Sequence, residues 1–519
     1  MSPIKPKDVR NIIKHKSNSS APGPDGISYG ILKKLPCLHH CFATLYNKIL
    51  WDGIPPTTWA QSRVTLIYKK GDTNDPANFR MIALSTVFGK IHHQIMANRS
   101  ATYMTENGYI DKSVQKAFIQ RINGVIEHNQ VLQEIIRHAH INKKTVHMTF
   151  YDLEDAFGSV SHQLIDTCLQ RYKYSEPIRK YISNLYSQLS SVAATKTWTS
   201  EPFTFKHGVF QGDPWSPIIF LTTFNPLLER LQKEQNFGYD LNGKKYITLP
   251  FADDFNLITS HKASHQRINN CISTWTKSMG LKLKPIKCRS LSIVSGCSKP
   301  VEFMLDNQPI STLADSPHKF LGSHLTYSGK QSEILETIEK HFIEKLDRID
   351  NLLIRDEYKL RIYKHYILPS SQFILTVHEL TKTSLKTLDS KVTRYLKKWA
   401  GLPRGASPAI LYTKGLLELK PICQLYEECQ TSAFISSRID ADKHVNHALD
   451  SRIQRENTWS KKQSTILMAE SNMNHVVHSC NATNSSAKVI KTAAKNTYKT
   501  ILQINGKTTS NPWSNKANT

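Results

Sequence analysis

The spacing of apolar residues along the chain predicts a mixture of helices and short strands. Apolar residues three and four positions apart predict helices at 86–100 and 124–140. An apolar, β-rich run bounded by polar residues predicts a buried strand at 146–153. From about 335 to 400 the pattern is mostly helical and alternates charged with apolar residues. The chain therefore combines an α+β centre with a mainly helical C-terminal region.

Two adjacent acids interrupt the apolar run YITLPFADDFNLITS at 246–260. The run predicts two strands joined by a tight turn, with Asp253 and Asp254 at its tip. Acids in such a setting are costly to bury unless a cation compensates them, and Mg²⁺ prefers carboxylate oxygens. Ordinary hairpin turns also carry acidic residues. A turn without a metal site is therefore the alternative interpretation of this pair.

A third acid, Asp152, follows the predicted strand TVHMTFY directly. Two metal ions roughly 3.5–4 Å apart need carboxylates from at least two chain segments. Asp152 and Asp253 would supply them. The alternative is that Asp152 caps the N-terminus of the helix that follows.

The segment HGVFQGDPWSP at 207–217 predicts a constrained loop that leads into a helix. Gly208 and Gly212 permit close backbone approach, and Pro214 stiffens the helix entry. A helix N-terminus of this kind can hold a phosphate or a base-paired nucleotide. A plain loop-to-helix junction is the alternative.

The charge balance indicates a polyanionic partner. The chain has 68 Lys and Arg residues against 42 Asp and Glu residues, a net charge of +26. Such a surface is typical of nucleic-acid binders. The nine cysteines form no repeated CxxC pair, and neither a signal peptide nor a membrane span is evident. We therefore expect an intracellular protein of the nucleus or the cytoplasm, without a membrane partner.

The order of three motifs resembles that of reverse transcriptases. Asp-x-x-x-Ala-Phe at 152–157, QGDPWSP at 211–217 and FADD at 251–254 are similar to motifs A, B and C of that family. APGPDGIS at 21–28 is similar to the N-terminal extension of non-LTR retrotransposon enzymes. Further likeness to the fingers motifs, motif D, the primer grip and the thumb extends the resemblance over about residues 1–425.

The resemblance implies an α+β right-hand polymerase with fingers, palm and a mainly helical thumb. Fingers and palm would occupy 1–330, with the fingers mainly at 1–145 and the palm mainly at 146–330. The thumb would occupy 331–425. We expect 426–519 to be a basic, polar and loosely ordered tail.

The resemblance also implies roles in catalysis. Asp152, Asp253 and Asp254 would bind two Mg²⁺ ions, which Mn²⁺ can replace, with Asp254 the most dispensable ligand. Lys287 would act as an acid or as an electrostatic stabiliser of pyrophosphate. A solvated lysine is the alternative for Lys287.

Other positions would recognise the incoming nucleotide. Phe157 would be a steric gate whose ring blocks a ribose 2′-hydroxyl and selects dNTPs. The remaining predicted nucleotide-binding residues are Lys69, Lys70, Arg80, Gln211 and Gly212.

The implied activity is RNA-directed DNA synthesis from a DNA 3′-hydroxyl on an RNA template, as in target-primed reverse transcription. The partners would be an RNA template, a DNA primer in an RNA–DNA heteroduplex, and dNTPs. A catalytically inactive nucleic-acid-binding relic is the alternative from another class. An RNA-dependent RNA polymerase is disfavoured by Phe157 and FADD, and a group II intron or telomerase-like enzyme by APGPDG and QGDPWSP. No nuclease constellation stands out, so we expect a truncated or stand-alone polymerase region that cannot nick its own target.

Overall fold

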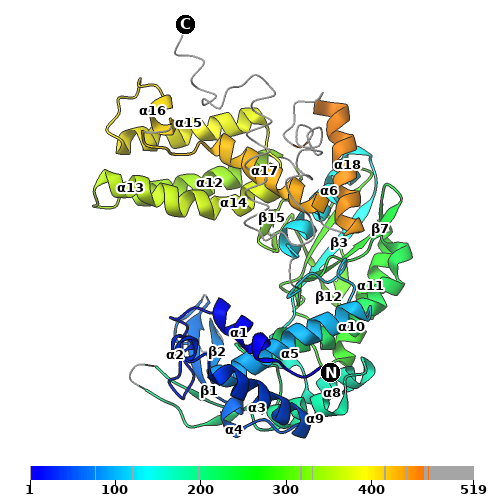
Figure 1. Ribbon diagram of the computed structural model, residues 1–519. Coiled ribbons are helices and arrows are strands. Elements are labelled where there is room, and N and C mark those ends of the chain that lie inside the picture. Colours follow the sequence, from blue (N-terminus) through cyan, green and yellow to red (C-terminus); the bar gives the residue numbers. More distant parts are fainter. Residues whose placement is uncertain are drawn as a thin grey trace.

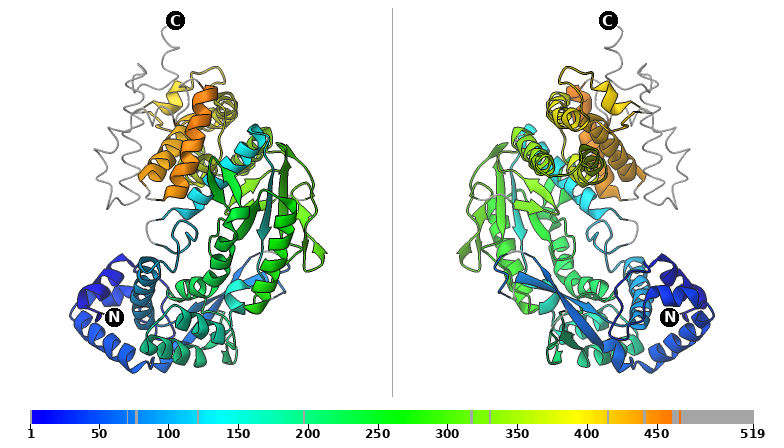
Figure 2. Two further views of the ribbon diagram at one scale, coloured as in Figure 1. Left: turned by 90° about the vertical axis from the view of Figure 1, so that its right-hand side faces the viewer. Right: turned by 90° about the vertical axis from the view of Figure 1, so that its left-hand side faces the viewer.

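The structure is a computed structural model of the chain. It describes residues 2–460 and 466, apart from 70, 76, 77, 120, 121, 196, 197, 316, 317, 330, 414, 415, 440 and 441. In Figure 1 the described chain curves like a letter C, with N-terminal helices at one end and C-terminal helices at the other. The two side views of Figure 2 show the same order, with a mixed helix-and-strand centre between the two ends. This is the arrangement of a right-hand polymerase fold, as the sequence predicts.

The N-terminal end consists of helices together with the strand pair β1–β2, which belongs to a four-stranded sheet. Its elements are α1 (Pro6–His15), α2 (Tyr29–Lys34), α3 (Leu38–Asp52), α4 (Thr57–Ala60), β1 (Gln61–Tyr68), β2 (Phe79–Leu84) and α5 (Val87–Glu106). β1 pairs antiparallel with β2 and parallel with β4 (Ser190–Ala193). β4 in turn pairs antiparallel with β5 (Phe203–Thr204). Because β4 comes more than a hundred residues after β1, the predicted fingers and palm are interleaved.

The central sheet has the strand order β10-β9-β3-β8, with β13 alongside β9. Its strands are β3 (Val146–Tyr151), β8 (Phe255–Thr259), β9 (Arg289–Val294), β10 (Cys297–Ser298) and β13 (Ser311–Thr312). Every residue of β3 is buried, because both faces of the sheet are covered. Thr149 bonds His265 of α11 (Lys262–Ser278), whereas Met148 packs on the opposite face beside α6 (Gly124–Ile141).

The helix α6 packs with this sheet. Val131, Leu132 and Ile135 lie in the same apolar cluster as Val146 and Met148. The predicted division at residue 145 therefore separates α6 from the sheet that buries it. Helical periodicity shows that a helix has an apolar face but not which neighbour covers that face.

The remaining central elements surround the sheet. They are α7 (Ala156–Ser159), α8 (His162–Arg171), α9 (Glu176–Ser187), α10 (Ser216–Lys233), η2 (Gln235–Phe237), β6 (Tyr239–Leu241), β7 (Lys244–Tyr246), β11 (Met304–Leu305), β12 (Gln308–Pro309), β14 (His318–Phe320) and β15 (Ser323–Leu325). Of the predicted strand before Asp253, only Tyr246 lies in a strand, because β7 ends there and pairs with β6, and Pro250 has no N–H for a ladder.

The C-terminal end is a helical bundle with its own apolar core. Its elements are α12 (Gln331–Asp350), α13 (Asp356–Ile362), η3 (Tyr363–Ile367), α14 (Leu368–Val377), α15 (Lys382–Trp399), α16 (Ala409–Tyr412) and α17 (Ile422–Ile439). Ile338, Phe342 and Leu346 of α12 share one face and meet Leu388 and Val392 of α15 in this core. The mainly helical region predicted from sequence therefore forms a unit of its own.

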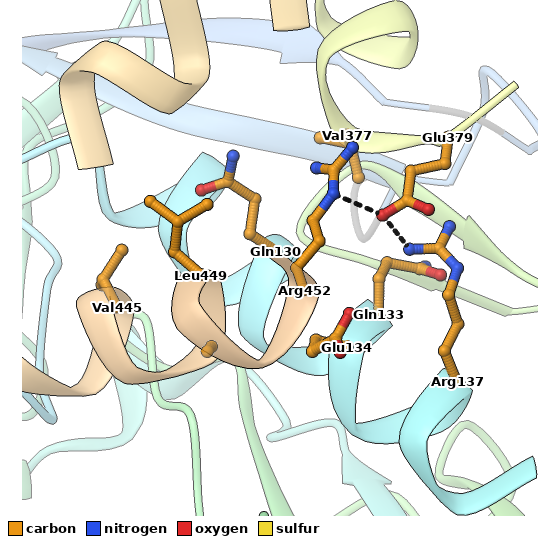
Figure 3. A pocket seen from close by; sticks show the side chains of 10 residues that line it. Gln130, Gln133, Glu134, Arg137, Val377, Glu379, Val445, Leu449 and Arg452 are labelled. Carbon is orange, nitrogen blue, oxygen red and sulfur yellow. Dashed lines mark ion pairs between the residues drawn. The ribbon is translucent and has the colours of Figure 1, made fainter. Parts of the chain in front are cut away.

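The expectation of loose order from residue 426 onward is wrong for its first part. α17 lies against α14 and α15, and α18 (Lys443–Ser460) lies along α6 (Figure 1). Arg452 of α18 and Arg137 of α6 both pair with Glu379, at 2.8 and 2.5 Å (Figure 3). The polar composition of this segment reflects buried ion pairs as well as solvent exposure. Residues 461–465 and 467–519 lie outside the described part. No described helix has both the length and the apolar character that crossing a membrane requires.

Candidate active site

Strand pairing brings the three predicted aspartates to one end of the central sheet. β3 and β8 run antiparallel, with Tyr151 opposite Phe255. Asp152 directly follows β3, and continuing this register places it opposite Asp254. Asp253 occupies the turn immediately before β8. Carboxylates from two segments, about a hundred residues apart, therefore converge.

Asp253 and Asp254 belong to a tight turn whose two loop residues are Ala252 and Asp253. We call residues 251–254 the aspartate hairpin. The N–H of Phe251 donates to the carbonyl of Asp254 at 2.7 Å, and the N–H of Asp254 donates back at 3.1 Å. Ala252, the first residue of the loop, has φ +57°. Glycine is favoured at this position of such turns, because a side chain there is strained. The backbone thus stores strain directly beside Asp253.

The acids repel one another. Burial raises the pKa of Asp253, the negative charge of Asp152 adds to the shift, and Arg80 opposes it. Asp254 lies at the surface, yet partial loss of hydration and the charges of Asp253 and Asp152 raise its pKa to about 6. The ammonium group of Lys287 is 3.7 Å from the Asp152 carboxylate. The site therefore carries excess negative charge that a bound cation would relieve.

The carboxylate oxygens of this site suit a hard divalent ion whose remaining ligands come from water and from a substrate. Among the described residues, no group of three or more Asp, Glu, His or Cys side chains is arranged so that it could hold a metal ion by itself. Mg²⁺ usually keeps several waters and binds through one or two carboxylates plus substrate phosphates. Asp152 and Asp253, with Asp254 beside them, fit that incomplete coordination.

Two of the residues predicted to contact the triphosphate, Arg80 and Lys69, lie on the β1–β2 hairpin. Arg80 is exposed on β2, opposite Ile67, and its charge acts on Asp253. Lys69 is exposed just after β1, where its N–H donates to the Asn78 carbonyl at 2.8 Å. Lys70 lies outside the described residues.

The loop with Gln211 and Gly212 is fixed against β2. The Ala83 N–H donates to the Gln211 carbonyl at 2.8 Å. Gly212 has φ +110°, and a Cβ there would come within 2.4 Å of the Ala83 carbonyl oxygen. Only glycine fits, so the close backbone approach predicted from sequence occurs at this position.

The ring of Phe157 is held from two sides. It stacks on Phe220 of α10 with ring centres 4.3 Å apart, and Phe118 meets it edge-on at 6.5 Å. Its side chain is only half-buried. The Phe157 carbonyl accepts a bond from the Val209 N–H at 2.8 Å, which ties the start of α7 to the segment before Gln211. A ring fixed in this way cannot easily swing aside.

Sequence reasoning missed the residues that support these segments. Asp213 is buried, accepts from the Trp215 N–H at 2.8 Å and pairs with His93. His93 in turn bonds the Tyr181 hydroxyl at 2.7 Å. Gln115 bonds the backbone of Ala252. Asp213 was visible inside QGDPWSP, but its partner lies on α5 and nothing in the sequence connects the two.

Comparison with known proteins gives a family and several relatives. Residues 67–325, about half of the chain, match the family model of the reverse transcriptase (RNA-dependent DNA polymerase). The Pol polyprotein of the type-1 retrotransposable element R2 of Nasonia vitripennis is 28% identical over 77% of this chain. The type-2 element R2DM of Drosophila melanogaster has a Pol polyprotein that is 25% identical over 75% of it. The chain spans 38% and 36% of the length of these two relatives.

Two solved telomerase structures align with most of this chain. A Candida albicans telomerase in complex with a fragment of telomeric RNA aligns with 82% of this chain and 68% of its own, at 9% identity and a TM-score of 0.38. Candida tropicalis telomerase aligns with 89% of this chain and 77% of its own, at 12% identity and a TM-score of 0.37. The sequence comparisons are the ones that identify the family. By the matched residues 67–325 and the R2 relatives, the chain belongs to the reverse transcriptases of non-LTR retrotransposons, which are RNA-directed DNA polymerases.

Proposed function

We propose that this chain extends a DNA 3′-hydroxyl on an RNA template by two-metal nucleotidyl transfer, as in target-primed reverse transcription. The observation that carries the proposal is the convergence of Asp152 with the aspartate hairpin at one sheet end. The raised pKa values of Asp253 and Asp254 support it, because mutually repelling carboxylates favour a bound cation.

Asp152 and Asp253 would hold the metal ions, with Asp254 as an auxiliary ligand. When bound, two Mg²⁺ or Mn²⁺ ions would lower the pKa of the primer hydroxyl and stabilise the charge on pyrophosphate. In the reaction the 3′-oxygen forms a bond to the α-phosphorus, the α–β phosphoanhydride bond breaks, and the hydroxyl proton leaves to solvent. Lys287, next to Asp152, would stabilise the departing pyrophosphate.

The fingers side would bind and select the nucleotide. Arg80 and Lys69 lie on the β1–β2 hairpin and would supply cations for the triphosphate. Gln211 and Gly212, fixed against β2, would pack against the templating base pair and the nucleotide. We assign the same triphosphate role to Lys70. The fixed ring of Phe157 would clash with a ribose 2′-hydroxyl.

The partners would be an RNA template and a DNA primer, held as a heteroduplex through their phosphates. The net charge of +26 supports backbone contacts with little sequence readout. Such substrates are found inside the cell, so we propose action in the nucleus or cytoplasm.

The test is Mg²⁺-dependent extension of a DNA primer on an RNA template, with dNTPs and rNTPs compared in parallel. We expect extension with dNTPs alone, and none with Asp253→Ala protein that still binds the heteroduplex. Extension by Asp253→Ala protein would overturn the metal assignment. Heteroduplex binding without extension by the unmodified chain would instead support an inactive nucleic-acid-binding relic.

The gate is tested separately with Phe157→Ala. Removing the ring should let the enzyme accept rNTPs and reduce discrimination by roughly 100-fold. Unchanged discrimination would show that another group excludes the 2′-hydroxyl.

A further inference from the structure

The aspartate hairpin needs an external support. Ala252 has φ +57°, a conformation that costs a residue with a side chain about 1 kcal/mol or more. Such conformations persist only where surrounding contacts impose them. The hairpin itself closes with only two backbone bonds, between Phe251 and Asp254. The position of Asp253 therefore depends on what holds Ala252.

The side-chain amide of Gln115 holds Ala252 at both of its backbone polar groups. Its Oε1 accepts from the Ala252 N–H at 3.0 Å, and its Nε2 donates to the Ala252 carbonyl at 3.4 Å. The same Oε1 accepts from the Ala117 N–H at 3.0 Å. The Gln115 side chain is buried, at 2% exposure, so these bonds are shielded from water. Among side chains of this length, only an amide both accepts and donates in this way.

The segment that carries Gln115 is itself fixed. The next residue, Lys116, is buried and pairs with Glu127 of α6 and with Asp442, which precedes α18. Phe118 has a positive φ of 56° and meets the Phe157 ring edge-on. One short segment between α5 and α6 therefore contacts both the aspartate hairpin and the ring beside it.

A second buried side chain holds the residues that directly precede the aspartate hairpin. Nε2 of His128, on α6, bonds the Pro250 carbonyl at 2.9 Å. The Asn256 side chain accepts from the Leu249 N–H at 2.7 Å. These contacts hold residues 249 and 250, but neither reaches Ala252. Gln115 is thus the contact that acts on the strained residue.

We propose that Gln115 is a positioning residue, which holds Ala252 in its left-handed conformation and so sets the orientation of Asp253 and Asp254. This rests on the proposed function. Gln115 acts through the hairpin, and its removal should leave the phosphate contacts that bind the heteroduplex unchanged.

The first test compares Gln115→Met with Gln133→Met. Gln133 is also buried, but it lies on α6 beside Glu134 and Arg137 and away from the hairpin. Gln115→Met should lower kcat for single-nucleotide addition by roughly 10- to 100-fold, while heteroduplex affinity changes less than about twofold. Gln133→Met should retain kcat. Equal losses in both variants would mean general destabilisation and would overturn the proposal.

The second test asks whether glycine can replace the support. Ala252→Gly allows a positive φ without strain. The loss caused by Gln115→Met should therefore be several-fold smaller in the Ala252→Gly background. Equal loss in both backgrounds would contradict the role of Gln115. If Gln115→Met does not fold, Gln115→Glu takes its place in both tests, because it retains the accepting oxygen and removes the donor.

The third readout does not depend on activity. In metal-free protein, amide exchange of a peptide covering 249–256 should be faster in Gln115→Met than in Gln133→Met. Unchanged exchange would overturn the proposal. These outcomes are separable from failure of the proposed function: if the unmodified chain extends no primer, the function fails, whereas the exchange result still decides the role of Gln115.

Discussion

Two groups of charged side chains in this protein differ in whether opposite charges surround their carboxylates. The aspartate hairpin sets Asp253 and Asp254 near Asp152, and mutual repulsion contributes to their raised pKa values. The second group, which we call the arginine cluster, pairs each acid with guanidinium groups between α6, α18 and the segment before α15. Its members are Glu134, Arg137, Glu379, Arg452 and Arg455. Figure 3 shows the pairs of Glu379 with Arg137 and Arg452.

Glu379, at the centre of the arginine cluster, has the opposite pKa shift to the hairpin aspartates, whereas burial raises the pKa of Glu134. Burial alone would raise the pKa of Glu379, but Arg137, Arg452 and Arg455 lower it to about 2. Its charge is compensated within the protein and stabilises the packing of α18 on α6. Among the residues that the structure describes, the carboxylates of the aspartate hairpin have no such set of partners. Charge that is compensated internally serves stability, and charge that is left uncompensated is available to a ligand.

The largest expected effect is from Asp253→Asn. Loss of this carboxylate should lower the rate of synthesis by roughly 1,000-fold or more, equal to about 4 kcal/mol of transition-state stabilisation. The melting temperature should not fall, because the change removes a repelling charge. Primer extension and a thermal melt on the same preparation measure both quantities. A clear loss of stability would break the contrast between the two groups.

The arginine cluster should show the reverse. Glu379→Gln leaves three buried guanidinium groups without their shared carboxylate, which should lower the free energy of unfolding by about 3 kcal/mol. Chemical denaturation followed by circular dichroism measures this. Glu344→Gln, in an exposed pair with Lys340, is the control and should change stability by less than about 0.5 kcal/mol. Equal effects of the two variants would show that the cluster contributes no more than a surface pair.

Acid should weaken the arginine cluster in a defined pH range. Glu379 has a folded-state pKa of about 2, below its ordinary 4.5, so its stabilisation is fully present above pH 4.5. It is lost as the pH falls from 4.5 towards 2, because the unfolded chain takes up the proton first. The facing charges are those of Arg137, Arg452, Arg455 and Glu134. Denaturation midpoints in this range should fall more steeply for the unmodified chain than for Glu379→Gln, and parallel curves would contradict this.

The smallest effect concerns Lys287. Its pair with Asp152 is exposed and 3.7 Å long, so Lys287→Met should change stability by less than about 1 kcal/mol. If it stabilises pyrophosphate, synthesis should slow by roughly tenfold, less than the loss of a full general acid would cause. Lys284→Met, which removes a neighbouring pair with Glu154, is the control and should leave synthesis unchanged. Equal rates in the two variants would make Lys287 a solvated lysine.

The sequence predicts the position of the helix at 124–140 correctly, but it does not predict that the chain stays ordered beyond residue 426. Residues 124–140 have a clear apolar period, and the structure has α6 at Gly124–Ile141. Residues 426–460 belong to the segment 426–519 that the sequence predicts to be a basic, polar and loosely ordered tail. Their polar groups find partners far away in the chain, such as Arg455 with Glu134 and Ser437 with Gln130. Composition cannot show that a charge is paired at such a distance.

The sequence by itself identified the candidate residues of the site, because Asp152, Phe157, QGDPWSP and FADD are local patterns whose residue types limit what they can do. Strand periodicity was enough to place Asp152 and Asp253 at strand ends. Only the tertiary structure decided that the two strands are neighbours in register, that Ala252 is strained and that Gln115 holds it. The reason is physical: side-chain periodicity is fixed within a few residues, whereas the contacts that orient the aspartates join segments more than a hundred residues apart.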